Sequence, residues 1–406
     1  MDQRRRMALL TEAAGLDRDR AVGITQVRGP GRGTTSLMRV MQTNACSLSC
    51  GYCPTFCGGK VRRTGLAPEE VAQTFMEAHR AGLAQGLFLT SGVPGRAARA
   101  TDRMLATLDL LRRREAFEGY VHVKLLPGAE PAQVEEAARL ATRISVNLEG
   151  PSDAYVRQLA REKDFSGDLL PKLEHAGRIF RDARHARAAG ESRRAGSTMN
   201  LDRPWRSTVT TQFVVGAVGE RDREILDVVA RLERQALLHH AHFSAFQPVV
   251  GTPMEGRAPT PARRELRLYQ AEHLLRDYGF RFEELAFERD GNLSLDRDPK
   301  TAWALAHPEH FPLEILRAPR ELLVRVPGIG PLAARRLVAA RRQATLRFAG
   351  DLRGVGVDIP RAGWFLTLRG RRLAEAPPAF QLRLFAHGEH LTQAPYDTPV
   401  PPCAYR

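Results

Sequence analysis

An apolar run in the sequence, Ser36-Leu-Met-Arg-Val-Met-Gln42, is followed by a cysteine-rich segment, Cys46-Ser-Leu-Ser-Cys50-Gly-Tyr-Cys53. The first run predicts a β-strand, and the second places three thiols just beyond its carboxyl end. Thiolates this close together can hold one iron–sulfur cluster, and three ligands would leave one iron open to another molecule. Zinc is the competing interpretation, but structural zinc takes four closed N/S positions, and its motifs usually come as two separated pairs. The sequence contains no second pair of this kind.

Two further cysteines complete the set of five. Cys57 is an alternative fourth ligand or a bystander near the cluster, and Cys403 lies in a proline-rich tail where an exposed thiol is the default. Cluster thiolates persist in a reducing compartment, and no segment approaches the roughly 20 apolar residues that cross a bilayer. We therefore expect a cytoplasmic protein without a membrane partner. The 406 residues, 43% of them hydrophobic, can fill one large α/β core and a small module.

Short apolar runs alternate with longer helical stretches over about residues 37–290, which is typical of βαβ units and a parallel sheet. The predicted fold class is α/β, with a partial (β/α)6 TIM-like barrel and a small all-α module. The stretch His175–Met199, rich in Arg, Ala and Gly, is expected to extend a helix or form a mobile loop. The predicted strands are Ser36–Gln42, Gly86–Thr90, Tyr120–Leu125, Arg143–Leu148, Thr208–Val215 and His242–Gln247.

The predicted strands separate apolar from polar side chains, because alternate residues of a strand point to opposite faces. In Tyr120–Lys124 the two valines share one face, and His122 and Lys124 share the other. The apolar face should meet the covering helices, so the polar face should line the lumen, which apolar side chains normally fill in such barrels. His122 and Lys124 are therefore candidates for contact with substrate or cofactor or for proton donation, or else they form a buried structural network.

The cysteine segment resembles the radical SAM superfamily, whose pattern is Cys-x3-Cys-x-aromatic-Cys. This resemblance implies a [4Fe–4S] cluster on Cys46, Cys50 and Cys53, with the open iron chelated by S-adenosylmethionine (SAM). One-electron cleavage of SAM then gives a 5′-deoxyadenosyl radical, so an electron donor such as flavodoxin or ferredoxin is expected. By position, Tyr52 would lie near the adenine, Ser91-Gly92 at the methionine amino group, and Asn147 or Glu149 at the ribose. The resemblance also assigns to the SAM site Gln212 and Gly216.

A closer resemblance, to the DNA modification/repair radical SAM proteins, extends over most of the chain. It implies DNA as the substrate and a partner resembling uracil-DNA glycosylase. The motifs that carry it are Gly86-Leu-Phe-Leu-Thr-Ser-Gly-Val93, Gly119-Tyr-Val-His-Val-Lys124, Ser145-Val-Asn-Leu-Glu149, Asp298-Pro-Lys-Thr-Ala-Trp-Ala304 and Val326-Pro-Gly-Ile-Gly330.

The C-terminal end concentrates the basic charge of the chain. The formal net charge is +15, and residues 311–372 hold 13 Arg and 4 acids, which is +9 of that total. Two predicted helices flank Pro327-Gly-Ile-Gly-Pro331, whose glycines permit a tight turn and whose N–H groups can meet a phosphate. The stretch resembles a helix-hairpin-helix element; the alternative is a hairpin that packs on the barrel with a solvated arginine face. The expected nucleic-acid contacts are Gly328, Ile329, Gly330, Arg335, Arg336, Arg341 and Arg342.

These observations predict three regions: a radical SAM domain at residues 1–310, a helix-hairpin-helix module at 311–372, and an extended proline-rich tail at 373–406. The leading hypothesis is a radical SAM enzyme that acts on DNA in modification or repair. An RNA- or tRNA-modifying enzyme is the alternative, because a phosphate-binding hairpin distinguishes the two poorly. A hypothesis of another class is a nucleic-acid-binding adaptor whose cluster is structural or redox-sensing.

Overall fold

The computed structural model describes residues 3–14, 24–28, 34–189, 207–343 and 346–374. The chain divides into two compact units. The first comprises the described residues of Met1–Glu220 and Arg231–Thr260, and the second those of Arg221–Ala230 and Pro261–Arg406. Residues 261–310, which the sequence analysis placed with the barrel, thus pack with the C-terminal part of the chain. The end of the His175–Met199 stretch and nearly all of the predicted tail lie outside the described residues.

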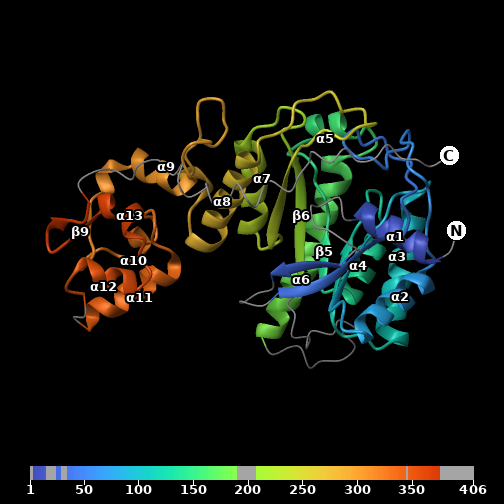
Figure 1. Cartoon of the computed structure of the whole chain (residues 1–406), viewed down its shortest axis with the longest axis horizontal. Coiled ribbons are helices and arrows are strands. Elements are labelled where there is room, and N and C mark those ends of the chain that lie inside the picture. The colour runs from blue at the N-terminus through green and yellow to red at the C-terminus, as the bar shows by residue number, and fades with distance from the viewer. Residues whose placement is uncertain (1–2, 15–23, 29–33, 190–206, 344–345, 375–406) are drawn as a thin grey trace. The chain divides into compact units, whose positions relative to one another are not determined.

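The first unit is built on one seven-stranded sheet whose strands follow one another in chain order (Figure 1). The six strands from β2 to β7 are parallel, as predicted, and β1 pairs antiparallel with β2. The curled sheet stays open, with β1 and β7 as its edges, so it forms a half-barrel. The strands are β1 Ile24–Arg28, β2 Thr34–Met41, β3 Gly86–Thr90, β4 Tyr120–Lys124, β5 Arg143–Ser145, β6 Thr208–Val215 and β7 His240–Ala245.

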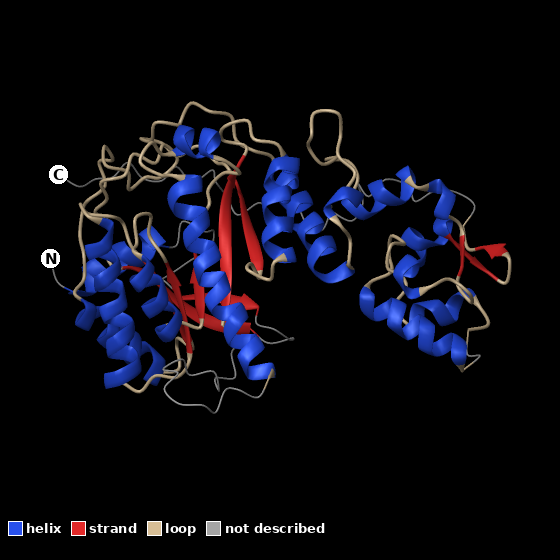
Figure 2. Ribbon diagram, turned by 180° about the vertical axis from the view of Figure 1, so that it is seen from behind, coloured by secondary structure: helices blue, strands red, loops and turns tan. Residues whose placement is uncertain are grey.

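Helices connect the parallel strands and pack side by side, in the order α2, α3, α4 and α6 (Figure 2). Helix α2 shows why they form where they do. It begins at Pro68, and the Glu70 carboxylate accepts a hydrogen bond from the Ala67 N–H at 2.8 Å; its inner face buries Val71 and Phe75. The helices of this region are α1 Gln3–Ala14, α2 Pro68–Arg80, α3 Ala97–Asp109, α4 Pro131–Leu140, α5 Asp153–Leu159 and α6 Leu170–Ala188; most of α7 Asp222–Arg234 belongs to the second unit.

The second unit combines short helices with a small sheet. Its module was predicted to be all-α, and this is wrong, because β8, β9 and β10 form a three-stranded sheet. These strands are two or three residues long, too short for an alternating pattern to reveal them. The elements are α8 Ala262–Tyr278, α9 Pro299–Ala306, β8 Leu313–Glu314, α10 Arg320–Leu323, α11 Pro331–Arg342, α12 Ala349–Gly354, α13 Ile359–Ala362, β9 Leu366–Leu368 and β10 Arg371–Arg372. No helix among the described residues of the chain is long and apolar enough to cross a membrane.

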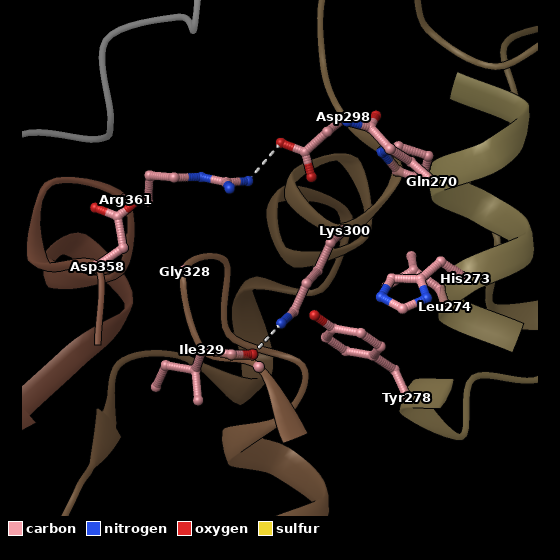
Figure 3. A pocket seen from close by; sticks show the side chains of 12 residues that line it. Gln270, His273, Leu274, Tyr278, Asp298, Lys300, Gly328, Ile329, Asp358 and Arg361 are labelled. Atoms are coloured by element: carbon pink, nitrogen blue, oxygen red, sulfur yellow. Dashed lines mark hydrogen bonds and ion pairs between the residues drawn. The ribbon is translucent and has the colours of Figure 1, made fainter. Parts of the chain in front are cut away.

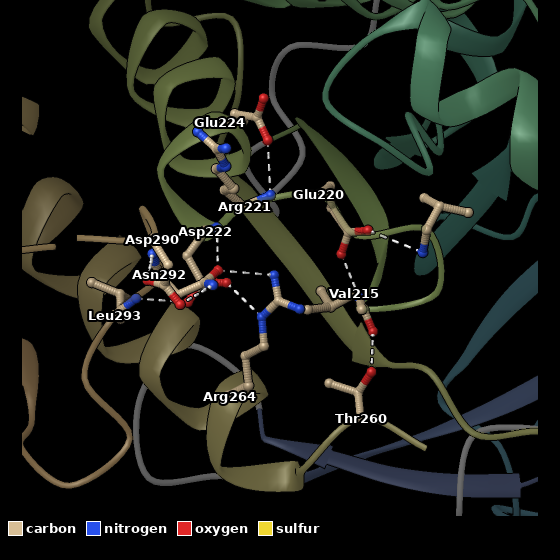
Figure 4. Close-up of polar contacts among 12 residues, drawn as sticks. Val215, Glu220, Arg221, Asp222, Glu224, Thr260, Arg264, Asp290, Asn292 and Leu293 are labelled. Carbon is tan, nitrogen blue, oxygen red and sulfur yellow. Dashed lines mark hydrogen bonds and ion pairs between the residues drawn. The ribbon is translucent and has the colours of Figure 1, made fainter. Parts of the chain in front are cut away.

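A buried carboxylate ties together three segments of the second unit (Figure 4). Asp222 is fully buried, and its side chain pairs with Arg264 at 2.7 Å and accepts a hydrogen bond from the Leu293 N–H at 2.9 Å. The Asp222 N–H donates to the Asn292 amide oxygen at 3.1 Å. The start of α7, the start of α8 and the loop before α9 therefore share one polar centre.

Asp222→Ala should lower the free energy of unfolding of the second unit by about 3 kcal/mol or more, because it leaves a largely buried guanidinium without this carboxylate. Arg281→Ala is the matched control, since the Arg281 side chain is 79% exposed in its 3.6 Å pair with Glu284, and should change stability by at most about 0.5 kcal/mol. Urea denaturation followed through Trp303 and Trp364 measures both. Equal effects of the two substitutions would contradict the assignment.

Candidate functional site

The cysteine segment lies directly against the carboxyl end of β3. The Gly92 N–H donates to the Thr43 carbonyl at 2.7 Å, and the Ser47 N–H donates to the Val93 carbonyl at 2.8 Å. A Cβ atom at Gly92 would lie 2.3 Å from the Ala45 carbonyl oxygen, so no other side chain fits there without a backbone shift. Gly92, predicted as a cofactor contact, thus sets the close approach of this loop to the sheet.

The Arg63 side chain binds several backbone carbonyls in and around the cysteine loop. The Arg63 guanidinium donates to the carbonyls of Asn44 at 2.7 Å, Thr55 at 2.8 Å, Phe56 at 2.5 Å and Gly59 at 3.2 Å. A rigid fork of donors suits such a set of converging carbonyls. This role could not be predicted from the sequence, because nothing local distinguishes Arg63 from a surface arginine.

The three predicted ligand thiols are more sheltered than the fourth. Cys50 is buried, Cys46 and Cys53 are half-buried, and Cys57 is exposed. Burial raises the pKa of the Cys50 thiol to about 11, with Lys163 acting in the opposite direction.

A buried ion pair stands beside the cysteines. The Lys163 Nζ lies 2.7 Å from the Glu149 carboxylate and 3.3 Å from the Tyr52 hydroxyl. Burial alone would raise the pKa of Glu149, but Lys163 and Lys124 outweigh it and lower that pKa. Tyr52 and Glu149, both predicted for the SAM site, are thus brought together by a lysine that the sequence analysis did not single out.

The backbone at Glu149 adopts a conformation that side chains seldom take. Its φ is +64°, and its N–H and C=O pair with the Gln212 carbonyl at 2.9 Å and the Val214 N–H at 2.8 Å. On the same sheet edge, the Asn147 side-chain amide donates a hydrogen bond to the Gln212 Oε1 at 3.1 Å. The Gln212 Nε2 in turn donates to the Ser244 hydroxyl at 2.7 Å. Strained backbone held by its neighbours is common at functional sites.

The end of β6 also requires a glycine. Gly216 has φ +87°, and a Cβ there would lie 2.0 Å from the Thr260 hydroxyl oxygen. That hydroxyl donates to the Val215 carbonyl at 2.8 Å (Figure 4). Close by, Tyr52 packs against an apolar cluster suited to a flat ring; its members are Leu159, Val214, Ala217, Phe246 and Met254.

Two polar atoms of the site are buried without a hydrogen-bond partner among the described residues. They are the Ser91 Oγ and the second carboxylate oxygen of Glu149. Buried polar atoms normally find partners, so each such atom needs an explanation. The Ser91 hydroxyl could accept a hydrogen bond from the amino group of SAM, and the Glu149 carboxylate could accept hydrogen bonds from its ribose hydroxyls. The three thiols could supply the cluster ligands. The residues present therefore fit a [4Fe–4S] cluster with SAM.

His122 and Lys124 share a strand face, as predicted, but meet different neighbours. Lys124 faces the charges of Glu149, Lys163 and the cysteines. His122 packs against Phe88 with ring centroids 4.6 Å apart, and burial, then Arg143, lowers its pKa well below the ordinary value. Lys124 is thus the candidate for contact near the cysteines, and His122 belongs to a separate layer of the lumen.

Comparison with known families agrees with this arrangement, since residues 40–183 match the radical SAM superfamily. The stretch is a radical SAM domain. It contains the three cysteines, β3, β4 and β5, and the Glu149–Lys163 pair. The chain therefore contains a radical SAM domain, and this superfamily uses a [4Fe–4S] cluster and SAM.

Similar solved structures include the FeFe-hydrogenase maturase HydG from Carboxydothermus hydrogenoformans, at 12% identity and a TM-score of 0.42; the match covers 58% of this chain and 50% of HydG. Methylornithine synthase (PylB) is similar at 15% identity and a TM-score of 0.42, with 58% of this chain and 61% of PylB covered. The chain thus spans about half to three-fifths of the proteins it resembles. No curated protein sequence matches the chain.

In the second unit, the predicted glycine turn joins α10 to α11. Gly328 has φ +82°, and a Cβ there would lie 2.7 Å from the Asp358 carbonyl oxygen. Ile329 is 1% exposed, and its N–H donates to the Val326 carbonyl at 3.1 Å within the turn. Gly330 precedes α11 without a side-chain cap. The first N–H groups of this helix therefore have no side-chain acceptor of their own.

The turn is held from beneath by a buried lysine. Lys300 donates to the Ile329 carbonyl, and its Nζ lies 4.7 Å from the Tyr278 ring centroid (Figure 3). The three residues line a pocket of about 300 Å³, at whose other side Asp298 pairs with Arg361 at 2.9 Å. Burial lowers the pKa of Lys300 to about 7.

The predicted phosphate-contacting arginines divide into two groups. Arg335, Arg336 and Arg342 are exposed on α11. Arg341 instead donates to the carbonyls of Ile315 at 3.3 Å and Ala318 at 2.6 Å, so it anchors the helix to the chain before α10. Its side chain is already committed within the fold, which the sequence spacing did not reveal.

A second glycine turn lies beside the first. It joins α12 to α13, with Gly356 at φ +94°. The Asp358 N–H donates to the Gly328 carbonyl at 3.0 Å, and the Arg336 guanidinium lies 3.9 Å from where a Gly356 Cβ would be. Two tight turns and an exposed arginine therefore share one surface.

Gly92→Ala should reduce the iron incorporated on reconstitution severalfold, because the new methyl group displaces the cysteine loop from β3. Gly256→Ala is the matched control, since a Cβ at Gly256 meets nothing within 4 Å. Iron content and visible absorbance of the folded proteins measure the effect. Full cluster occupancy in Gly92→Ala would contradict the claim that only glycine fits beside the Ala45 carbonyl.

The pH dependence of stability should reveal Lys300. Its folded pKa of about 7 lies below the ordinary 10.5, so the unfolded chain binds more protons between these values and stability rises with pH there. From about pH 7.5 to 9.5 the wild type should gain about 2 kcal/mol relative to Lys300→Met. Urea denaturation across this range measures the difference, with the exposed Lys60→Met as the charge control. Parallel curves for wild type and Lys300→Met would rule out the depressed pKa.

Proposed function

We propose that this radical SAM enzyme acts on DNA, in modification or repair. The observation that carries the proposal is the paired glycine turns with the exposed Arg335 and Arg336 beside them, within a region of net charge +9. The uncapped start of α11 and the arginines suit backbone phosphates, which need no base contact. The resemblance to the DNA modification/repair radical SAM proteins supports DNA over other polyanions.

The first unit supplies the chemistry in this proposal. When bound, the cluster and SAM supply a 5′-deoxyadenosyl radical that abstracts a hydrogen atom. The chain's own residues would position and shield SAM. Glu149, oriented by Lys163, would accept hydrogen bonds from the ribose hydroxyls, and Ser91 would accept one from the amino group. Tyr52 would cover the apolar side of SAM. Lys124, which faces these groups, is the proposed substrate contact.

Two partners follow from the proposal. Reductive cleavage of SAM needs a one-electron donor such as flavodoxin or ferredoxin. A protein resembling uracil-DNA glycosylase is proposed as a partner in the same DNA transaction, on the basis of the family resemblance alone. A base inside a duplex would have to leave the stack before a buried site could act on it.

Arg335→Ala with Arg336→Ala should weaken duplex DNA binding and reduce the slope of log affinity against log salt by about 2, one for each lost phosphate contact. Arg317→Ala with Arg320→Ala makes the same charge change at exposed arginines before and at the start of α10, and should reduce the slope less. Fluorescence anisotropy over a salt series measures both. Equal reductions would indicate a general charge effect and contradict the turn site.

The same titration with RNA of matched sequence tests the substrate class. The proposal expects DNA to bind at least as tightly as RNA, with the same dependence on Arg335 and Arg336. A clear preference for RNA would move the proposal to an RNA- or tRNA-modifying enzyme, which uses the same first unit.

A further inference from the structure

Two histidines and a glutamate converge just after α9, outside every site described above. The segment His307-Pro-Glu-His310 contains η5, a 3-10 turn over Pro308–His310. One nitrogen from each imidazole and one carboxylate oxygen of Glu309 lie within 4.8 Å of one another. We infer that His307, Glu309 and His310 form a site for a divalent transition metal ion such as zinc.

The distances suit a single small ion. The Glu309 Oε1 lies 2.9 Å from the His307 Nδ1 and 3.8 Å from the His310 Nε2. Ligand atoms on a tetrahedral zinc with bonds of 2.0–2.2 Å are about 3.4 Å apart, so the two distances bracket the required value. A small rotation of the Glu309 side chain suffices, because that side chain is 60% exposed.

A buried tryptophan orients both imidazoles. The Trp303 ring is stacked on His310 at a centroid distance of 5.7 Å and an angle of 11°, and it contacts His307 at 4.6 Å. Trp303 is 3% exposed and therefore fixed in place. Groups that fix the ring orientation of metal-binding histidines raise metal affinity, and the indole does this here by stacking.

The charge and chemistry of the set favour a borderline metal. Two imidazoles and one carboxylate suit zinc, copper, nickel or ferrous iron, whereas magnesium and calcium prefer oxygen ligands. Glu309 offsets one of the two positive charges of the ion. Arg325, which lies 5.7 Å from the Trp303 centroid, is itself paired with Glu284 at 2.7 Å. Three protein ligands leave a position open to water, as in zinc sites that are not purely structural.

Zinc titration of the anaerobically reconstituted full-length protein tests the site by calorimetry. Wild type should bind one more equivalent of zinc than His307→Ala or His310→Ala, or bind that equivalent at least tenfold more tightly. His273→Ala is the matched control, because His273 also contacts a carboxylate, that of Asp277 at 2.6 Å, but belongs to no three-ligand group among the described residues; it should behave as wild type. Zinc taken up by thiols is common to all four proteins and cancels.

Copper quenching of tryptophan emission gives an independent readout. Cu²⁺ at the proposed site should quench the Trp303 emission, and this part of the quenching should disappear in Trp303→Phe and His310→Ala. Identical zinc stoichiometry and affinity in wild type, His307→Ala and His310→Ala would overturn the proposal. So would quenching by Cu²⁺ in His310→Ala that equals the quenching in wild type.

Discussion

The close contact between the cysteine loop and the end of β3 is the constraint on which the site depends. Gly92 leaves room only for a hydrogen atom beneath the Ala45 carbonyl, and the backbone bonds to Thr43 and Val93 follow from that approach. The loop is then closed by Arg63, which occupies four carbonyl groups at once. With both sides held, the three thiols face the same region at the carboxyl ends of the strands, where parallel barrels place their chemistry.

Burial of charge next to these thiols has to be compensated. An ionised carboxylate or ammonium in a buried position is costly unless it is paired, and Glu149 and Lys163 satisfy this requirement together. The pairing keeps a carboxylate available for hydrogen-bond donors without leaving a net buried charge. In the second unit, Lys300 instead contacts a carbonyl and the face of Tyr278, and burial lowers its pKa to about 7. One buried lysine thus serves an ion pair and the other shapes a turn.

Local patterns predicted the framework well. The bounds of β3 and β6 agree with the predicted runs, because each is a run of apolar or β-branched residues, with a single glutamine in β6. β5 is shorter than predicted, ending at Ser145, because the chain leaves the ladder before the left-handed residue Glu149. β1 was missed, since an edge strand paired antiparallel with β2 carries only a short, weak alternation. Lys163 and Arg63 were missed because their roles depend on contacts that no spacing in the sequence encodes.

The central claim is that Cys46, Cys50 and Cys53 build a cluster that cleaves SAM. The most direct measurement is the formation of 5′-deoxyadenosine by the anaerobically reconstituted protein with SAM and a strong reductant, in wild type and Cys50→Ala. The account predicts 5′-deoxyadenosine and methionine from wild type, and loss of both the product and the iron-dependent absorbance in Cys50→Ala. A wild-type protein with a full cluster that forms no 5′-deoxyadenosine, or a Cys50→Ala protein that still forms it, would contradict the account.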